Sequence, residues 1–494
     1  DFYIVLCFLA SYMPGSLKAN YIFNLLNTVL GLLFPLITFP YAARVVMADG
    51  IGQVNFFSSI ISYISLFTCL GIPMYAIREI ARVRDDKKKL STITTEILLL
   101  HTGLTILGYF AVVVLCMTIT KVKADIPLFL LLSTNIFFVA IGCEWFYQGV
   151  EDFKYITIRG LIVKVVSVIL LFVLVRTKDD LMYYAAYSVI GVVGGNVFNF
   201  IRLRKYIRIR LLQFSELRPL RHLKPALHIF VLNLIISIYV NLDTVMLGFM
   251  KDPTNVGYYV GATKLTKMLL GLTLALGTVM LPRLSNLITT GQKAEFDRLS
   301  QRAMDFVVAF SLPLFLGLFV LAPSLIRVLC GDSYEPAIIT LQVISPIVLI
   351  IALSNVVGIQ VLYPQGKENI VIMSTLVGAI VNFTLNLVLI PQYAQNGAAI
   401  ATVIAESCVT ITMIILGVKY LPFKLLNRKY IFYLLAAMLM FAVCWGIRMS
   451  DLTDFVTIII SSIVGVVVYA GMLYLGKDPF AMEFAAVIRA KLSK

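Results

Sequence analysis

Apolar runs of about 20 residues recur along the whole chain, separated by short polar segments. A helix rises about 1.5 Å per residue, so a run of this length crosses the roughly 30 Å of a bilayer's hydrocarbon core. The pattern predicts an all-α integral membrane protein with about fourteen transmembrane helices. Their approximate limits are 20–43, 53–77, 94–119, 126–147, 157–175, 181–201, 227–249, 256–281, 303–329, 337–362, 370–390, 397–418, 430–447 and 455–475.

The composition agrees with a membrane protein. Of the 494 residues, 60% are hydrophobic and 14% are charged, whereas about a quarter of an average soluble domain is charged. The cysteines are scattered singly without CxxC spacing, and the three histidines form no metal-binding pattern. We therefore expect no disulfide and no metal site. We also expect no cofactor, and the short loops outside the cytoplasm favour a transporter and no enzymatic activity. The net charge of +15 does not indicate a nucleic-acid partner, because of where the basic residues lie.

Most of the Lys and Arg residues fall on one side of the membrane when alternate loops are assigned to it. The positive-inside rule makes that side cytoplasmic and places both termini there. Segments 78–89 and 202–224 dominate this charge. We interpret them as topology signals that would also attract anionic lipid headgroups. At the same side, Glu144 and Trp145 close the fourth span, where we expect an interfacial aromatic belt.

Weak self-similarity at a separation of about 205 residues suggests two homologous halves, a common plan in secondary transporters. "MADGIGQVNFF" after the first span is similar to "MKDPTNVGYYV" after the seventh.

The first Met is Met13, so whether residues 1–12 are native stays open. The predicted segments are 1–19, an N-terminal extension and cytoplasmic segment; 20–201, the first lobe; 202–226, a basic cytoplasmic linker; 227–418, the second lobe; and 419–494, the last two spans and a cytoplasmic tail.

Polar residues form stripes on several of the predicted helices. Residues three, four or seven apart share one helical face, so each stripe either hydrogen-bonds a neighbouring helix or lines a polar cavity. Symmetric positions in the two halves favour the cavity. The stripes comprise Asn20, Asn24, Asn27 and Thr28 in the first span, Asn55, Ser58, Ser59, Ser62 and Ser65 in the second, and Asn233, Ser237, Asn241 and Thr244 in the seventh.

Lys264 and Lys267 lie inside the apolar run 256–281. Two lysines facing lipid at a helix centre would cost roughly 5 to 7 kcal/mol. Lys264 lies some 13 Å from the start of its span, beyond the reach of a side chain that snorkels to the interface. A spacing of three places both ammonium groups on one face. We therefore expect them to line a water-filled cavity that accepts an anionic cargo.

Among the other charged residues within or at the ends of spans, four could take part in transport. Lys164 either snorkels to the interface or joins the cavity. Arg44 either anchors the outer end of its helix or steers cargo. Asp243 and Glu406 each either neutralise a nearby cation or bind a coupling ion, and an isolated carboxyl group there can hold a proton.

Several segments resemble the bacterial polysaccharide transporter family, the Wzx-type O-antigen flippases of the multidrug/oligosaccharidyl-lipid/polysaccharide exporter superfamily. They are "LKANYIFNLLNTVLGLLFPLITFPYAARVVMADGIGQVNFF", "CEWFYQGVEDFKYITIRGLIVKVVS", "NLDTVMLG" and "NGAAIATVIAE". One departure is "RVVMADG", where relatives usually have Leu-Gly before Ala-Asp-Gly. Val46 and Met47 in that place put the local turn in question.

The resemblance implies a MATE-like bundle of two six-helix lobes with pseudo-twofold symmetry and two added helices. It implies a flippase that moves undecaprenyl-pyrophosphate-linked repeat units of O-antigen or capsule across the bacterial inner membrane by alternating access. The expected partners are this polyprenyl-pyrophosphate-linked oligosaccharide, membrane lipids and the polysaccharide polymerase machinery. We expect Lys264, Lys267, Lys164 and Arg44 to hold the pyrophosphate. The sugars would contact Asn24, Asn27, Asn241 and Ser62, with proton or sodium coupling at Asp243 or Glu406.

Other functions remain open at this stage. A peptidoglycan-precursor flippase would have the same fold and an anionic cargo. A multidrug exporter of that fold would typically carry organic cations, which buried lysines match poorly. A membrane O-antigen polymerase or glycosyltransferase would be expected to carry a sizeable external loop with catalytic Arg, Asp or Glu, and the sequence shows no such loop.

Overall fold

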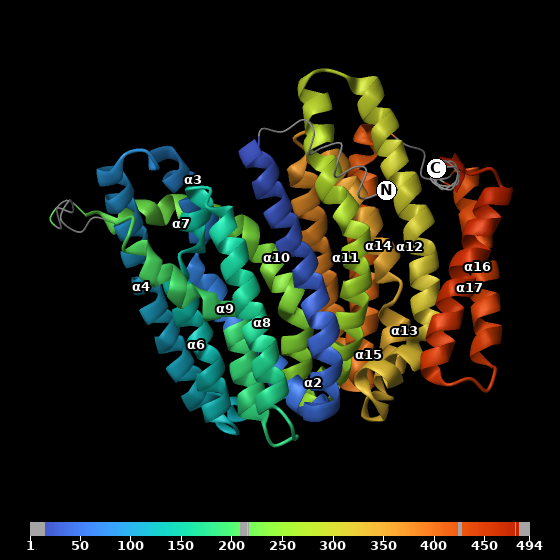
Figure 1. Ribbon diagram of the computed structural model, residues 1–494, viewed down its shortest axis with the longest axis horizontal. Helices are drawn as coiled ribbons and strands as arrows, with labels where there is room; N and C mark the ends of the chain where they lie inside the picture. The colour runs from blue at the N-terminus through green and yellow to red at the C-terminus, as the bar shows by residue number, and fades with distance from the viewer. Residues whose placement is uncertain (1–14, 208–214, 216, 423–426, 480, 484–494) are drawn as a thin grey trace. The chain divides into compact units, whose positions relative to one another are not determined.

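The structure of the chain, a computed structural model, describes residues 15–207, 215, 217–422, 427–479 and 481–483. Within these ranges it gives no side-chain description for 15–33, 231–233, 235–238, 275–276 and 278–279. Every regular element of the described ranges is a helix (Figure 1). The predicted all-α architecture is confirmed.

The chain divides into two compact units, one of residues 1–46 and 53–241 and the other of residues 47–52 and 242–494. Unit 1 contains α2 (Gly15–Cys69), α3 (Ile72–Val83), α4 (Lys87–Thr118), α5 (Thr120–Lys123), α6 (Ile126–Gly142), α7 (Glu144–Gly149), α8 (Phe153–Leu174), α9 (Leu181–Leu203), the 3₁₀-helix η3 (Pro219–His222) and most of α10 (Leu223–Met250). The basic segment 202–226, predicted as a separate linker, lies within unit 1. The predicted lobe boundaries stay predictions.

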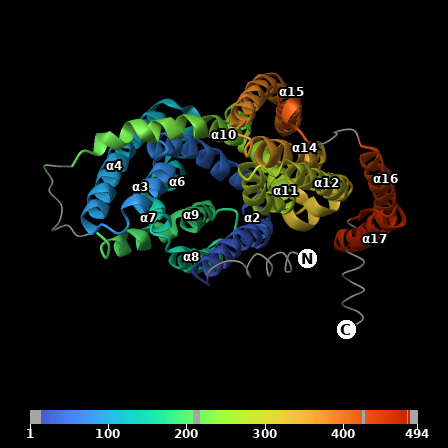
Figure 2. The ribbon, with the colours of Figure 1, turned by 90° about the horizontal axis from the view of Figure 1, so that it is seen from above.

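Unit 2 contains the end of α10 and all helices that follow it. These are α11 (Pro253–Thr289), α12 (Lys293–Cys330), η4 (Asp332–Tyr334), α13 (Ala337–Ile344), α14 (Ile347–Asn355), the π-helix η5 (Val356–Leu362), α15 (Glu368–Gly417), η6 (Val418–Tyr420), α16 (Arg428–Arg448) and α17 (Asp454–Leu475). Both views show α16 and α17 side by side, and these two helices pack against α12 (Figures 1 and 2).

Two helices are broken at a residue of positive φ. Met47 in α2 has φ 63° and ψ 179°, and Ala394 in α15 has φ 47° and ψ −126°. Each break separates two predicted spans that were expected as distinct helices. By length and composition, ten helical stretches in the described part of the chain qualify as membrane spans, and each broken helix counts once among them. The protein is therefore a multi-pass membrane protein.

Aspartates begin several of the spans. Asp86 accepts hydrogen bonds from the backbone N–H groups of Lys88 and Lys89, each at 3.1 Å. Asp125 accepts one from Leu128 at 3.1 Å at the start of α6, and Asp152 caps α8. The first N–H groups of a helix have no partner within the helix, and a carboxylate supplies one. These caps stabilise the first turns of α4, α6 and α8.

The core of unit 1 includes an aromatic cluster at the ends of α3, α4 and α7. Phe146 and Tyr147 are fully buried in it, and Trp145 is only 4% exposed. The expectation that Trp145 forms an interfacial belt is therefore wrong, because its ring fills the unit's core. Exposed apolar side chains on α4, α8, α16 and α17, among them Phe110, Ile162, Leu435 and Val466, give these helices surfaces suited to contact with lipid.

Candidate functional site

Asp243 of α10 is buried within unit 2, with 8% of its surface exposed. Its Oδ1 accepts hydrogen bonds from the side-chain amides of Asn382, at 2.9 Å, and Asn386, at 2.7 Å. Its Oδ2 accepts from the hydroxyl groups of Tyr259, at 2.6 Å, and Thr402, at 2.8 Å. All four donors are neutral. The carboxylate thus joins α10, α11 and α15 through dipoles, a low-cost way to bury a charge.

The break in α15 brings two of its own segments to Asp243. Asn382 and Asn386 lie four residues apart and share one face of the first half. After Ala394 the second half runs back alongside the first. At Gly397 a Cβ atom would lie 2.3 Å from the carbonyl oxygen of Leu389. The absence of a side chain there permits the close packing that places Thr402 beside the asparagines.

The hydrogen bonds around Asp243 can accommodate two protonation states. The Thr402 hydroxyl has one hydrogen, and both Asp243 Oδ2 and the carbonyl oxygen of Ala398 lie 2.8 Å from its oxygen. When Asp243 is ionised, Thr402 donates to it. When Asp243 carries a proton, Asp243 can donate to Thr402 while Thr402 donates to Ala398, and no heavy atom needs to move.

The same cluster also offers oxygens to a metal cation. Asn386 Oδ1 is buried and has no hydrogen-bond partner, and an unsatisfied buried acceptor costs about 1 to 3 kcal/mol. Asp243 Oδ2 and the carbonyl oxygen of Ala398 both neighbour the Thr402 hydroxyl, and oxygen atoms of these types are the ligands that hard cations prefer. The arrangement can therefore hold either a proton or a small metal cation.

Lys264 and Lys267 follow Tyr259 along α11. Lys264 is half-buried and Lys267 is exposed. The two ammonium groups lie close enough to repel each other, and Lys267 is also attracted by the negative charge of Asp243. A change of charge at Asp243 is therefore felt at Lys267.

The other cationic residues expected at the site belong to unit 1. Lys164 of α8 is half-buried, with its Nζ 6.0 Å from the centre of the Phe34 ring, and Arg44 of α2 is exposed. That Lys164 and Arg44 line the same cavity as Lys264 and Lys267 stays a prediction.

The expected polar and acidic residues differ in their surroundings. The Ser62 hydroxyl donates to the carbonyl oxygen of Ser58 at 2.8 Å, within its own helix. Asn241 is half-buried. The side chains of Asn24 and Asn27 lie outside the described residues. Glu406 of α15 is 9% exposed and contributes none of the four donors to Asp243.

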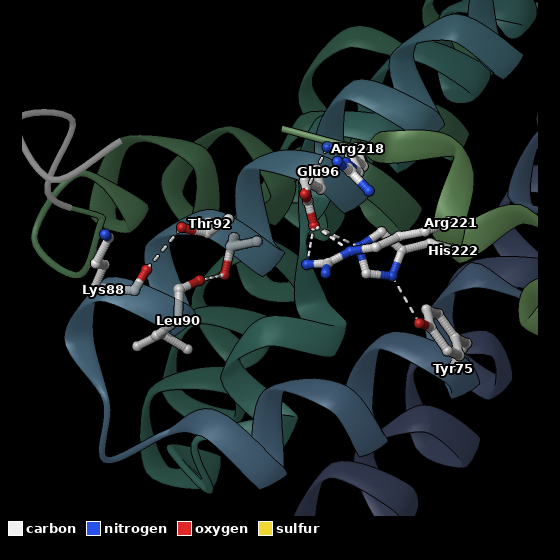
Figure 3. Close-up of polar contacts among 9 residues, drawn as sticks. Tyr75, Lys88, Leu90, Thr92, Glu96, Arg218, Arg221 and His222 are labelled. Carbon is white, nitrogen blue, oxygen red and sulfur yellow. Dashed lines mark hydrogen bonds and ion pairs between the residues drawn. The ribbon is translucent and has the colours of Figure 1, made fainter. Parts of the chain in front are cut away.

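A second buried carboxylate, Glu96 of α4, holds the end of the basic loop (Figure 3). The Glu96 side chain is 1% exposed. It accepts hydrogen bonds from the backbone N–H of Arg218, at 2.7 Å, and from His222 Nε2, at 2.9 Å. The Arg221 guanidinium forms a salt bridge with it, and the Tyr75 hydroxyl lies 2.7 Å from His222 Nδ1. These contacts fasten the residues that precede α10 to α3 and α4.

The sequence interpretation missed the partners of both carboxylates. The repeat of Asn at 382 and 386 inside an apolar run was a usable signal, because amides on one face of a spanning helix need a polar partner. Glu96 gave a weaker signal, since Arg221 and His222 are more than 120 residues away and were interpreted only as topology signals.

Comparison with known proteins finds a matching family and several relatives. The sequence profile of a family described as "Polysaccharide biosynthesis protein" matches residues 17–288. A relative from Escherichia coli (strain K12), named "Putative O-antigen transporter", is 26% identical over 413 residues, covering 82% of this chain and 97% of that protein. A flippase from Haloferax volcanii, named "Probable low-salt glycan biosynthesis flippase Agl15", is 18% identical over 249 residues, covering 50% of this chain and 52% of that protein.

Solved structures share the fold. The lipid II flippase MurJ, in an inward closed conformation, superposes with a TM-score of 0.69 at 16% identity and covers 96% of this chain and 100% of its own. An inward-facing multidrug resistance MATE family transporter of the MOP superfamily superposes with a TM-score of 0.60 at 12% identity, covering 78% and 97%. The MATE-like fold expected from the sequence is thus confirmed. Because the family profile covers more than half of its residues, the chain belongs to the polysaccharide biosynthesis protein family.

Proposed function

We propose that the protein is a flippase that carries undecaprenyl-pyrophosphate-linked repeat units of a surface polysaccharide from the inner to the outer leaflet of the bacterial inner membrane. Both termini would lie in the cytoplasm. Its sequence relatives named for O-antigen transport and glycan flipping support this proposal. The observation that carries it is the pair Lys264 and Lys267 in α11, a helix of 37 residues between two turns.

The chemistry of such a cargo explains the need for cationic side chains within the spanning helices. A pyrophosphate and its sugars cannot cross about 30 Å of hydrocarbon, because each polar group would lose its water without replacement. Lys264 and Lys267, joined by Lys164 and Arg44, would hold the pyrophosphate in a water-filled cavity whose Asn and Ser side chains contact the sugars. The polyprenyl chain would stay in lipid. A lysine acts as a point charge, which suits a cargo that must also be released.

We further propose that Asp243 binds the coupling cation, either a proton or sodium. Loading a cation onto Asp243 neutralises the charge that attracts Lys267. Lys267 would then interact more strongly with the anionic cargo. By linkage, bound cargo would raise the affinity of Asp243 for the cation by the same factor.

Translocation of the lipid-linked oligosaccharide in proteoliposomes, with and without an ion gradient, tests the flippase proposal. The double variant Lys264→Ala and Lys267→Ala should reduce transport to the rate of empty vesicles while the protein still inserts. Lys293→Ala is the matched control, because Lys293 is exposed at the first residue of α12. Transport by the double variant at the wild-type rate would contradict the proposal.

A peptidoglycan-precursor flippase is the second candidate, since its lipid-linked pyrophosphate would meet the same two lysines. The same vesicles loaded with lipid II decide between them. The proposed function requires faster transport of the polysaccharide repeat unit than of lipid II.

A further inference from the structure

Helix α10 begins in unit 1 and ends in unit 2. Its residues up to Asn241 belong to unit 1, and those from Leu242 onward belong to unit 2. It is helical at every residue from Leu223 to Met250. At about 1.5 Å per residue, Asp243 lies about 30 Å from Leu223 along the helix axis. A shift of the first turn can therefore reach Asp243 through one unbroken helix.

The first turns of α10 pack closely against unit 1. A Cβ atom on Gly71, in the turn before α3, would lie 2.6 Å from the carbonyl oxygen of Ala226 and 2.8 Å from the backbone nitrogen of Phe230. The centre of the Phe230 ring lies 5.5 Å from that of Phe67 in α2. Because Gly71 lacks a side chain, the backbone of α10 lies directly against the turn between α2 and α3.

Glu96 of α4 holds the residues just before α10 (Figure 3). Its carboxylate binds the backbone N–H of Arg218 and the side chains of Arg221 and His222. The side chains of Glu96 and His222 are only 1% and 4% exposed. Breaking such a pair leaves a buried charge without its partner, whereas a surface ion pair breaks at little cost. This carboxylate therefore fixes the start of the helix.

The other end of α10 is fixed in unit 2 through Asp243. Its four hydrogen bonds, to α11 and to both halves of α15, are between 2.6 and 2.9 Å long. Hydrogen bonds of this kind weaken beyond about 3.2 Å. A displacement of α10 by a few tenths of an ångström is therefore enough to change the geometry of this cluster.

We propose that Phe67, Gly71 and Glu96 form a clamp that positions Asp243 through α10. The clamp sets where Asp243 lies along the helix axis, and thereby how the oxygen atoms around it are arranged. This inference rests on the proposed role of Asp243 in ion coupling. By linkage, a change at Asp243 acts back on the clamp with the same coupling free energy.

Hydrogen–deuterium exchange of the full chain in detergent tests this coupling without requiring transport. Glu96→Gln removes the negative charge that pairs with Arg221. It should speed amide exchange in residues 242–250 and 382–402 by about two- to thirtyfold, the order by which a coupled residue shifts a distant equilibrium. Arg221→Gln is a milder second variant, because Arg221 is half-exposed, and it should change exchange in the same direction.

The matched control is Arg82→Gln. Arg82 is exposed and pairs with Glu79 within α3, so this variant removes a charge without touching the clamp. Exchange in the same two segments should match the wild type. Faster exchange confined to residues 67–100 and 217–230 in Glu96→Gln would overturn the proposal, because the clamp would then be a local anchor. An equal increase in α16 and α17 would also overturn it, since that would be a general loss of stability.

The reverse measurement separates this inference from the ion-coupling proposal. Asp243→Asn should speed exchange in residues 217–230, because coupling is reciprocal. If exchange there is unchanged, the positioning role of the clamp fails, even if transport depends on an ion gradient. If exchange responds in both directions but transport ignores the gradient, the ion-coupling proposal fails and the link between the clamp and Asp243 stands.

Discussion

At the scale of single residues, Met47 holds a backbone conformation that its side chain disfavours. Its φ of 63° and ψ of 179° fall in a region that is essentially restricted to glycine. The sequence analysis marked this position, because the family resemblance led us to expect glycine there. The conformation is imposed by the turn between the two spans of α2, and holding a non-glycine residue in it costs on the order of 1 to 3 kcal/mol.

Met47→Gly is therefore expected to stabilise the protein by about 1 kcal/mol. This is the backbone strain that glycine relieves, reduced by the larger conformational entropy that glycine has in the unfolded chain. Thermal unfolding of the purified protein in detergent measures the change. Met373→Gly is the control, since Met373 is exposed inside the helical part of α15. It should destabilise by about 1 kcal/mol. Equal destabilisation by both variants would show that the Met47 turn is not strained.

At the scale of elements, the two turns related by the internal repeat contact each other within unit 2. A Cβ atom on Gly52 would lie 1.8 Å from the carbonyl oxygen of Pro253, and one on Gly257 would lie 1.9 Å from that of Ala48. The Thr254 hydroxyl donates to Asp49 Oδ1 at 3.4 Å. The weak similarity of these segments therefore corresponds to paired turns that fit only because both glycines lack a side chain.

Gly257→Ala should destabilise unit 2 by about 1 to 3 kcal/mol, because the added methyl group meets backbone that cannot rotate away. Gly103→Ala in α4 is the matched control, since a Cβ atom there has no neighbour within 4 Å. That variant should be neutral or stabilise by up to about 1 kcal/mol. A comparison of the two melting temperatures in the same detergent measures the difference, and equal melting temperatures would contradict the tight contact.

At the scale of the whole molecule, the features that could be predicted from the sequence are those that depend on the local pattern of apolar and charged residues. The membrane spans followed from run length, and Lys264 and Lys267 stood out because of their apolar surroundings. The partners of Asp243 could not be predicted from local pattern. Asn382, Asn386 and Thr402 lie more than 130 residues away along the chain, in a helix that doubles back at Ala394. Trp145 was misplaced for the same reason, since burial against other helices decides its position.

The proposed coupling of ion to cargo is a property of the whole transporter, and Asp243→Asn tests it. The amide keeps the shape of the side chain but removes the charge that binds a cation and attracts Lys267. A ligand at one hundred times its dissociation constant stabilises a protein by about 2.7 kcal/mol. Sodium should therefore raise the melting temperature of the wild type and leave that of Asp243→Asn unchanged.

The same variant should translocate cargo at a rate that no longer responds to the ion gradient. Glu406→Gln is the comparison, because Glu406 is a buried carboxyl of α15 that makes none of the hydrogen bonds to Asp243. Glu406→Gln should keep both the stabilisation by sodium and the dependence of the transport rate on the ion gradient. If Glu406→Gln loses them and Asp243→Asn does not, the coupling site lies at Glu406. The oxygen cluster around Asp243 would then serve only to join α10, α11 and α15.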